Sequence, residues 1–309
     1  MKINEFQQNQ RIETMLLVSQ VSNGMAQNGA PYLTVSFKDN SGVIDGKVWD
    51  VKPEQIELLK AGNVVKVLAE VIDYRGKLQL KVLSAEKIDQ NSIDISEFLP
   101  TTKVPINELR ETIDEAIERI GDSDIKAVVS EIYKKYDTEI YSSPAAAKNH
   151  HEFKGGLATH VVGMLRLAQE VCKLYPVLNE DLLVAGVLLH DVGKIKELGG
   201  IAVTEYTLEG KLLGHISISQ TMVQETADEL GIESESITLL RHLILSHHGE
   251  YEFGSPVLPL TIEAEVLHYI DDFDAKITMI KKELDQTKEG EFTTRIPALN
   301  GRAFYKMKQ

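Results

Sequence analysis

The sequence of 309 residues contains a single cysteine, Cys172, which excludes an internal disulfide and any site built from several thiolates. No apolar run approaches the roughly 20 residues that a membrane-spanning helix needs, and residues 1–5 lack the pattern of a secretion signal. Histidine is absent from residues 1–149 and 269–309. We therefore expect a cytoplasmic protein that does not engage membranes, with two cores and with its chemistry in the second half.

The net charge of −14 is unevenly distributed. Residues 1–88 contain 11 basic and 10 acidic residues and sum to +1, which leaves −15 for residues 89–309. Nucleic acid phosphates are repelled by an acidic protein, but the near-neutral first part can meet a polyanion through local basic strips. The acidity belongs to the histidine-bearing part, where a cation would neutralise some of the carboxylates.

Residues 11–86 have the alternating apolar and polar pattern of β-strands, interrupted by turn residues. The predicted strands cover residues 12–21, 32–38, 43–49, 64–74 and 77–83, with a short helix at 53–59. Three strands, a helix and two strands is the order of the five-stranded OB-fold barrel. We therefore predict an OB-fold domain over residues 1–88, followed by a polar linker over residues 89–105.

After the linker, apolar residues recur at the spacing of a helix, which predicts an all-α domain over residues 106–309 with its core at about 150–285. The predicted helices cover residues 106–120, 123–136, 156–174, 179–189, 215–230, 234–248 and 260–284. Residues 200–210 fit either a short β-excursion or a loop, and the tail 290–309 has no assignment. The chain is thus predicted to be a multidomain α+β protein.

Two histidines and two carboxylates fall on the apolar faces of three predicted helices: His160, His190, Asp191 and Asp271. A lone histidine on such a face is usually a hydrogen-bonded core residue. A carboxylate there is costly to bury unless it is paired with a cation. Of the two neighbouring aspartates, Asp271 lies on the apolar face of its predicted helix and Asp272 lies off it. Together these residues favour a divalent metal site over an ordinary core.

Three more histidines, His215 and the pair His247 and His248, lie at predicted helix ends. They are either surface residues near a helix dipole or ligands of a second ion, since two ions about 3.5–4 Å apart suit phosphoryl chemistry. We favour the second interpretation. Lys194 lies one helical turn from His190 and Asp191, where it either touches a phosphate oxygen or is an ordinary solvated lysine. His242 and His268 have no such neighbours and are interpreted as structural.

At these residues the sequence resembles the HD-domain metal phosphohydrolases, whose pattern is matched by His160, the pair His190 and Asp191, and Asp271. The stretches 190–194 and 150–157 also fit this family, which makes the match more specific. Combined with an OB-like first domain, nearly the whole chain is similar to the YhaM-type 3′→5′ exoribonucleases of Gram-positive bacteria. The resemblance implies manganese-type divalent ions, with Co²⁺, Fe²⁺ or Mg²⁺ as alternatives, and single-stranded RNA or DNA as substrate. The 3′→5′ polarity follows from the resemblance alone.

One face of the predicted barrel combines aromatic and basic side chains. It lies opposite the apolar face of strand 32–38 and carries Tyr32, Lys38, Lys47 and Trp49. Bases stack on aromatic rings and phosphates pair with ammonium groups, so this face suits a single strand of nucleic acid. OB-like barrels also bind sugars and proteins, and the two rings equally fit a role in capping the barrel core.

We therefore predict a two-domain exonuclease that hydrolyses single-stranded RNA, and DNA as a second substrate, to nucleoside 5′-monophosphates. The predicted catalytic residues are His190, Asp191 and Lys194, and the predicted ligands of two ions are His160, His190, Asp191, His215, His247, His248 and Asp271. One alternative is an HD phosphohydrolase of small nucleotides or cyclic dinucleotides. The other is a non-catalytic nucleic-acid-binding protein with a remnant HD domain. A second copy of the chain is a further candidate partner.

Overall fold

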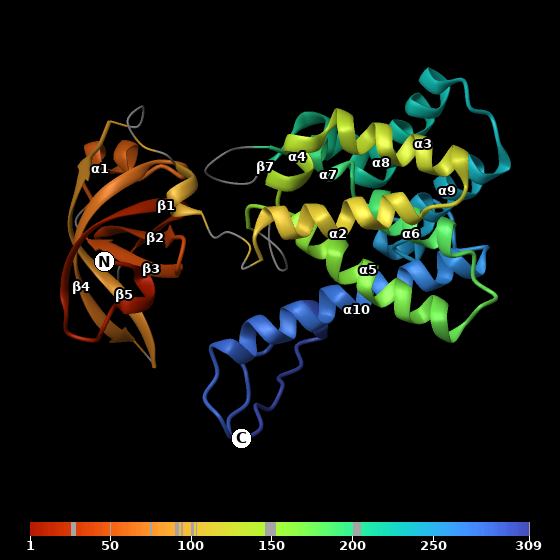
Figure 1. Ribbon diagram of the computed structural model, residues 1–309. Helices are drawn as coiled ribbons and strands as arrows, with labels where there is room; N and C mark the ends of the chain where they lie inside the picture. Colours follow the sequence, from red (N-terminus) through yellow and green to blue (C-terminus); the bar gives the residue numbers. More distant parts are fainter. Residues whose placement is uncertain are drawn as a thin grey trace. The chain divides into compact units, whose positions relative to one another are not determined.

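The structure is a computed structural model that describes residues 1–25, 29–49, 51–74, 76–89, 93, 95–99, 102, 104–145, 153–199 and 205–308. The chain divides into two compact units, one of strands and one of helices, with the division near residue 102 (Figure 1). None of the helices in these ranges is long and apolar enough to cross a membrane. The predicted motif segment at residues 150–152 lies outside the described residues.

The first unit is a closed barrel with the strand order β1-β2-β3-β5-β4. Its strands are β1 (Arg11–Met25), β2 (Pro31–Asp39), β3 (Gly42–Trp49), β4 (Val64–Tyr74) and β5 (Lys77–Lys87). Neighbouring strands are antiparallel except β3 and β5, which pair in parallel. Helix α1 (Pro53–Leu58) joins β3 to β4. The order of elements confirms the predicted OB-fold, and β1 and β5 run four residues further than their patterns indicate.

The barrel is filled by side chains from alternate positions, as the period of a strand requires. In β2, Leu33, Val35 and Phe37 are at most 2% exposed. The ring of Phe37 occupies the space where a Cβ at Gly46 would be. Phe98, in the segment predicted as linker, packs with Leu17 of the barrel. Part of that segment is therefore attached to the first unit.

The second unit packs its helices around one apolar core. The helices are α2 (Ile106–Arg119), α3 (Ser123–Lys135), α4 (Asp137–Ser142), α5 (Gly156–Leu174), α6 (Glu180–Leu189), α7 (Lys194–Glu197), α8 (Leu208–Leu230), α9 (Glu235–Ser246) and α10 (Ile262–Asp285). The seven predicted helices are all present. Helix α8 begins seven residues before the predicted start and is kinked at Gly214 (φ 71°), because that residue adopts a non-helical conformation.

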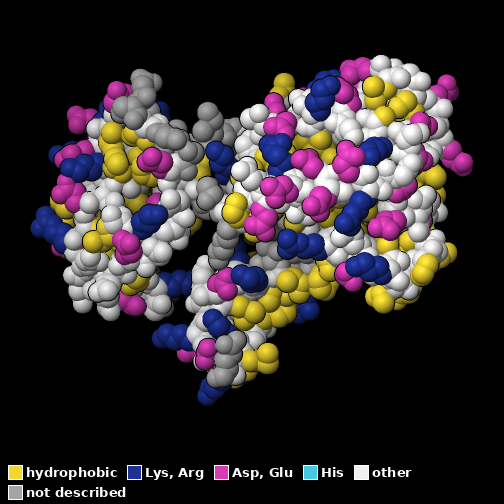
Figure 2. Space-filling model, viewed as in Figure 1, with side chains coloured by type: hydrophobic (Ala, Val, Ile, Leu, Met, Phe, Trp, Pro, Cys, Tyr) yellow, Lys and Arg dark blue, Asp and Glu magenta, His cyan; other side chains and the backbone are white. Residues whose placement is uncertain are grey.

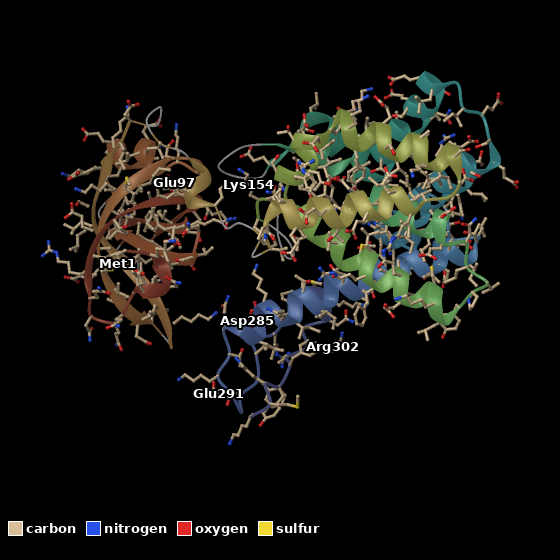
Figure 3. The ribbon with its side chains drawn as sticks, viewed as in Figure 1. Met1, Glu97, Lys154, Asp285, Glu291 and Arg302 are labelled. Carbon is tan, nitrogen blue, oxygen red and sulfur yellow. The ribbon has the colours of Figure 1, made fainter. Side chains whose placement is uncertain are left out.

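Two segments without a firm prediction have defined structure. The two-residue strands β6 (Leu198–Gly199) and β7 (Glu205–Tyr206) form a small sheet, so the described part of the 200–210 region contains a short strand, β7, before α8 begins at Leu208. The tail after α10 folds back on itself through bridges between Phe292 and Tyr305 and between Ile296 and Arg302. Figure 3 labels Arg302 in this segment.

Helix α6 is the central element of the helical unit. Its side chains from Leu182 to Leu189 are all buried, because α5, α9, α10 and α3 pack around it. The side chain of Asn179 accepts a hydrogen bond from the Leu182 backbone N–H and so caps the first turn. The residues that follow the last turn of this helix are consequently held in the interior.

Candidate metal centre

The seven side chains predicted as metal ligands lie together inside the helical unit. They are carried by α5, by the residues that follow α6 and α9, by α8 after its kink, and by α10: His160, His190, Asp191, His215, His247, His248 and Asp271. His160, His190 and His247 are fully buried, and Asp191 is 2% exposed. Burial of so many titratable groups is costly unless they pair with one another or with a cation.

Asp191 lies at the centre of the cluster, because its two carboxylate oxygens face different histidines. Oδ2 lies 3.3 Å from Nε2 of His190 and 3.8 Å from Nε2 of His160. Oδ1 lies 3.3 Å from Nε2 of His215 and 3.9 Å from Nε2 of His247. A single carboxylate between two groups of imidazoles can contribute one donor atom to each group.

The first group consists of His160, His190 and Asp191, whose ligand atoms all lie within 4.8 Å of one another. Asp271 extends it from α10, with Oδ1 at 3.1 Å from Nε2 of His160. Two imidazoles and two carboxylates form a mixed nitrogen and oxygen donor set of the kind that divalent first-row metals accept.

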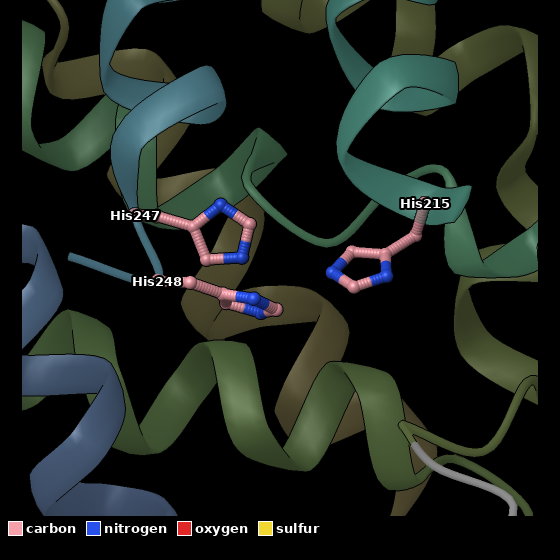
Figure 4. Close-up of side chains that lie close together, drawn as sticks. All are labelled: His215, His247 and His248. Carbon is pink, nitrogen blue, oxygen red and sulfur yellow. The ribbon is translucent and has the colours of Figure 1, made fainter. Parts of the chain in front are cut away.

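The second group consists of His215, His247 and His248, whose ligand atoms also lie within 4.8 Å of one another. Figure 4 shows the His215 ring facing the two neighbouring rings from across the site. The ring centroids of His247 and His248 are 4.4 Å apart, and His215 lies 5.6 and 5.2 Å from them. With Oδ1 of Asp191, these rings form a second set of four donors.

All five imidazoles of the cluster direct the same ring nitrogen outward. In each ring Nδ1 lies between 2.7 and 3.1 Å from an oxygen acceptor, which is a carboxylate in two cases and a backbone carbonyl in three. The pairs are His160 with Asp274, His190 with Val187, His215 with Glu197, His247 with Ile244, and His248 with Phe253. Because a carbonyl or carboxylate oxygen only accepts, Nδ1 carries the hydrogen and Nε2 faces the centre.

The atoms at the centre test whether the site fits a cation. Nε2 of His190, His215 and His247 and Oδ1 of Asp191 are buried, and within the described part of the chain they have no hydrogen-bond partner. With Nδ1 protonated, these nitrogens and this oxygen present lone pairs to one another. Such lone pairs repel unless a positive charge lies between them, so the residues fit a divalent cation.

The pKa values of three histidines in the cluster are shifted from their usual values. Burial opposes protonation of His160, but its hydrogen bonds with Asp271 and Asp274 outweigh burial and raise its pKa to about 10. Burial lowers the pKa of His248 and holds that of His247 well below its usual range. The last two rings are therefore neutral at pH 7, which is the form that binds a metal.

Lys194 lies beside the central carboxylate. Its Nζ donates a 2.6 Å hydrogen bond to Oδ2 of Asp191, and its side chain is 12% exposed. Burial works against the charged forms, but the attraction between the two groups raises the pKa of Lys194 and lowers that of Asp191 well below its usual range. Both groups are therefore charged at neutral pH.

Two acidic residues at the site were not identified from the sequence. Asp274 and Glu197 accept the Nδ1 hydrogens of His160 and His215, and Glu197 also accepts the backbone N–H of His215. Asp274 follows Asp271 by three residues, so the spacing of one helical turn is the signal that places it beside the same cluster. Glu197 has no comparable signal, because its approach to His215 depends on how α7 packs against α8.

A glycine in the predicted motif permits the close packing at the centre. A Cβ at Gly193 would clash with the backbone oxygen of His215 and with Ser219, and the Gly193 N–H donates a 2.8 Å hydrogen bond to the Ser219 hydroxyl. Only a residue without a side chain lets α8 approach the turn after α6 this closely. The glycine therefore helps to bring His215 to Asp191.

The two histidines interpreted as structural are held by backbone groups. Nε2 of His242 accepts a 2.9 Å hydrogen bond from the Leu260 N–H. Nδ1 of His268 lies 3.0 Å from the backbone oxygen of His247. Neither ring belongs to the groups that could hold a metal among the described residues.

In the barrel, three of the four residues predicted to bind nucleic acid lie together. Tyr32 and Trp49 are opposite each other on β2 and β3, with ring centroids 4.9 Å apart. Nζ of Lys47 lies 4.5 Å from the centre of the Tyr32 ring, and Trp49 is 48% exposed. Lys38 shares the face of Tyr32 but lies six residues further along β2, or about 20 Å at the usual rise of a strand.

The sequence analysis missed two other residues of this face. Lys81 on β5 lies opposite Lys47 in the parallel pair, which adds a third basic residue, after Lys38 and Lys47, to the face that Tyr32 shares. Gly24 on β1 pairs with Tyr32, and a Cβ there would clash with the Tyr32 ring. The aromatic ring thus lies across a backbone position that has to lack a side chain.

Family models match both units. The model of the HD domain matches residues 157–276, and the model of the OB-fold nucleic acid binding domain matches residues 17–88. The first match contains all seven predicted metal ligands, and the second contains the aromatic and basic face of the barrel.

Similar proteins match over almost the whole chain. The 3′-5′ exoribonuclease YhaM of Bacillus velezensis is 47% identical over 298 residues, which cover 96% of this chain and 95% of that protein. The 3′-5′ exoribonuclease YhaM of Bacillus subtilis is 46% identical with the same coverage, and that of Geobacillus sp. is 46% identical over 98% of this chain and 94% of its own length. On this likeness, and on the combination of its two domains, the chain belongs to the family of YhaM-type 3′-5′ exoribonucleases.

Proposed function

We propose that this protein is a metal-dependent 3′→5′ exonuclease that hydrolyses single-stranded RNA to nucleoside 5′-monophosphates. The observation that carries the proposal is the position of the buried Asp191 between two groups of imidazoles. The 3′→5′ polarity rests on the family, whose members carry that activity in their names.

The proposed ligands are the seven residues of the cluster, with Asp191 shared between two ions. Divalent ions held there would supply Lewis-acid chemistry at the phosphodiester and a nucleophile derived from water at neutral pH. The outward hydrogen bonds of the imidazoles, two of them to Asp274 and Glu197, fix the rings so that Nε2 faces the reacting centre. Lys194 keeps its positive charge beside Asp191, where it offsets the negative charge that develops on the phosphate.

We propose Mn²⁺ as the ion, with two ions per chain. The choice of Mn²⁺ follows the family resemblance. The donor set is compatible with it, because carboxylates suit Mn²⁺ and imidazoles suit first-row metals such as Fe²⁺, whereas Mg²⁺ sites are usually built from oxygen donors. Titration of metal-free protein with Mn²⁺ measures the number of ions bound per chain. Two equivalents are expected for the wild type, and His248→Ala should lose the ion of the second group while keeping the first.

The barrel face of Tyr32, Lys47 and Trp49 is proposed to hold the strand. Its exposed tryptophan ring can stack on a base, and the Lys47 ammonium group, which lies over the Tyr32 ring, can pair with a phosphate. Lys38 is proposed to contact the backbone of the strand further along β2. Because stacking accepts any base and either sugar, single-stranded DNA is proposed as a second ligand.

We also propose that the chain self-associates. Hydrophobic side chains gather along the surface of α10 (Figure 2), where Tyr269, Phe273 and Ile277, spaced by four residues, are 61, 53 and 48% exposed. A second copy of the chain would cover this stripe, and Phe273→Glu is expected to reduce the mass measured in solution.

A cytoplasmic location remains part of the proposal, on the basis of the single, buried Cys172.

Incubation of the protein with Mn²⁺ and single-stranded RNA labelled at its 5′ end tests the function. The wild type should shorten the strand stepwise and release nucleoside 5′-monophosphates. Asp191→Asn should abolish hydrolysis, and Asp272→Asn, on the same helix as Asp271 but paired with Lys276, should retain it. Rapid cutting of closed circular RNA or length-independent turnover would favour a phosphohydrolase of small nucleotides. Binding without hydrolysis would favour the non-catalytic alternative.

A further inference from the structure

A pocket of about 280 Å³ opens beside the second histidine group. Its polar wall is formed by His215, His248, Ser217 and the acidic Glu197, and its apolar walls are formed by Leu213, Phe253 and Pro256. Polar ligand atoms beside an apolar surface are typical of a site for a small molecule with one charged end and one aromatic end. The pocket is therefore a candidate for more than water access to the metal centre.

We propose that this pocket binds the 3′-terminal nucleotide of the strand, with the base stacked on Phe253 and its phosphate directed toward His215 and His248. The inference rests on the proposed function, and it assigns the residue that receives the substrate end. One edge of a nucleotide is a flat apolar ring and the other is an anion, which matches the two kinds of wall.

The Phe253 ring is 61% exposed although it lies beside a buried centre. Its position is tied to the metal centre, because the backbone oxygen of Phe253 accepts the 2.7 Å hydrogen bond from Nδ1 of His248. The short helical turn Tyr251–Phe253 is closed by hydrogen bonds from the Phe253 and Gly254 N–H groups. A base stacked on this ring would thus lie at a defined distance from the second histidine group.

The proposed phosphate end of the pocket lies at the start of a helical segment. The kink at Gly214 makes His215 the start of a new helical segment that continues to Leu230, and Gly214 through Ser217 line the pocket. The first turn of a helix is the positive end of its dipole. Glu197 also lines the pocket, and its carboxylate already accepts the His215 N–H, so a phosphate at this wall would depend on the cation that the second histidine group is proposed to hold.

The size of the pocket limits what can enter. Its volume of about 280 Å³ is just below the roughly 300–1,000 Å³ that is typical of small-molecule sites, which suits a ligand of the size of a single nucleotide. With the terminal nucleotide in this pocket, the terminal phosphodiester would lie beside the second histidine group. This position would account for products that are single nucleotides.

Phe253→Ala and Tyr251→Ala form a matched pair, because Tyr251 lies in the same turn and is 66% exposed but does not line the pocket. With Mn²⁺ and short single-stranded RNA, Phe253→Ala should raise the KM by about 5- to 150-fold, the range expected when a base loses its stacking partner. Phe253→Tyr should restore it. Tyr251→Ala should behave like the wild type, and Mn²⁺ content should be equal in all four proteins.

A second measurement does not depend on turnover. In a Trp49→Phe, Phe253→Trp variant the single tryptophan reports on the pocket, and adenosine 5′-monophosphate should quench its fluorescence while inorganic phosphate should not. An unchanged KM in Phe253→Ala together with no quenching by the nucleotide would overturn the pocket assignment, while the loss of hydrolysis in Asp191→Asn would still support the proposed function. A wild type that does not degrade RNA would instead remove the proposed function itself.

Discussion

Nδ1 of His160 and a carboxylate oxygen of Asp274 lie 2.7 Å apart, so a residue outside the predicted ligand set fixes the orientation of a predicted ligand. The opposite nitrogen of the same ring lies 3.1 Å from Asp271. Two carboxylates one helical turn apart thus hold both sides of one imidazole. A histidine held in this way binds a metal more tightly, because its ring does not have to be ordered when the ion arrives.

Asp274→Asn should therefore weaken metal binding without removing a ligand. Loss of a partner of this kind typically costs about 10- to 100-fold in metal affinity or activity. Calorimetric titration of metal-free protein with Mn²⁺ measures the change. Asp272→Asn is the control, since that neighbour pairs with Lys276 at the surface. Equal affinities for the two variants would show that Asp274 does not position His160.

Removal of the metal should lower the stability of the helical unit. The buried lone pairs of His190, His215 and His247 would again face Asp191 without a cation between them. An ion that binds only the folded state stabilises it by about 2.7 kcal/mol when its free concentration is 100 times its Kd. Thermal unfolding with and without chelator is the measurement. Asp191→Asn should unfold at the same temperature in both conditions, and a chelator-induced shift in that variant would contradict the expectation.

A pH-dependent contribution to stability is expected from Asp122. Its carboxylate accepts hydrogen bonds from the backbone N–H groups of Asp124 and Ile125 at the start of α3 and from the Ser236 hydroxyl at the start of α9. Burial would raise the pKa of Asp122, but these hydrogen bonds outweigh burial and lower it. A lowered pKa means that the stabilisation is present above the unfolded value of about 3.9 and is lost as the pH falls through the folded value.

Asp122→Ala should accordingly lower the free energy of unfolding by about 0.5–2 kcal/mol at neutral pH, the range for the loss of a helix cap. The difference from the wild type should shrink as the pH falls below about 4, because both proteins then lack the charged carboxylate. Asp122→Asn keeps a cap without a charge and should be intermediate at neutral pH. Denaturant unfolding of the three proteins at pH 7 and at pH 3 measures these differences. A difference between the wild type and Asp122→Ala that is the same at both pH values would contradict the expectation.

The elements of the fold were predictable because their signals are local. Alternation around Val35 identifies a strand, and the long apolar faces of α5 and α10 identify helices, since one side of each element is buried. The start of α8 was not predictable in the same way. Its first turns expose Leu208, Leu212 and Leu213 and continue through a glycine kink, so the apolar period that identifies a buried helix begins only after Gly214.

The grouping of these side chains at the candidate site was predictable because a buried carboxylate beside a histidine conflicts with an ordinary core. The hydrogen-bond partners of the imidazoles were less predictable. Glu197 and the backbone oxygen of Phe253 reach the imidazoles through tertiary packing, and neither has a sequence spacing that identifies its role. The same holds in the barrel, where Lys81 reaches the face of Lys47 only because β5 pairs in parallel with β3.

The barrel face offers a pair of variants that separate stacking from charge. Trp49→Ala should weaken binding of a single strand by about 1–3 kcal/mol, since one base loses its stacking partner, and should leave the salt dependence unchanged. Lys47→Ala should instead reduce the slope of log K against log salt concentration by about 0.7, because each phosphate contact on a single strand releases about that number of counterions.

Both binding effects should be measured by titrating labelled, non-hydrolysed strands of increasing length into metal-free protein at several salt concentrations. Affinity should rise with strand length in the wild type, because a strand that reaches along the face of β2 and β3 makes more contacts than a mononucleotide. Tyr74→Ala, an exposed aromatic residue at the end of β4, is the control and should match the wild type. If Trp49→Ala binds long strands as the wild type does while Tyr74→Ala weakens them, the strand follows a different surface of the barrel. If neither variant nor the salt concentration changes the affinity, the barrel has another partner and the helical unit alone selects the substrate.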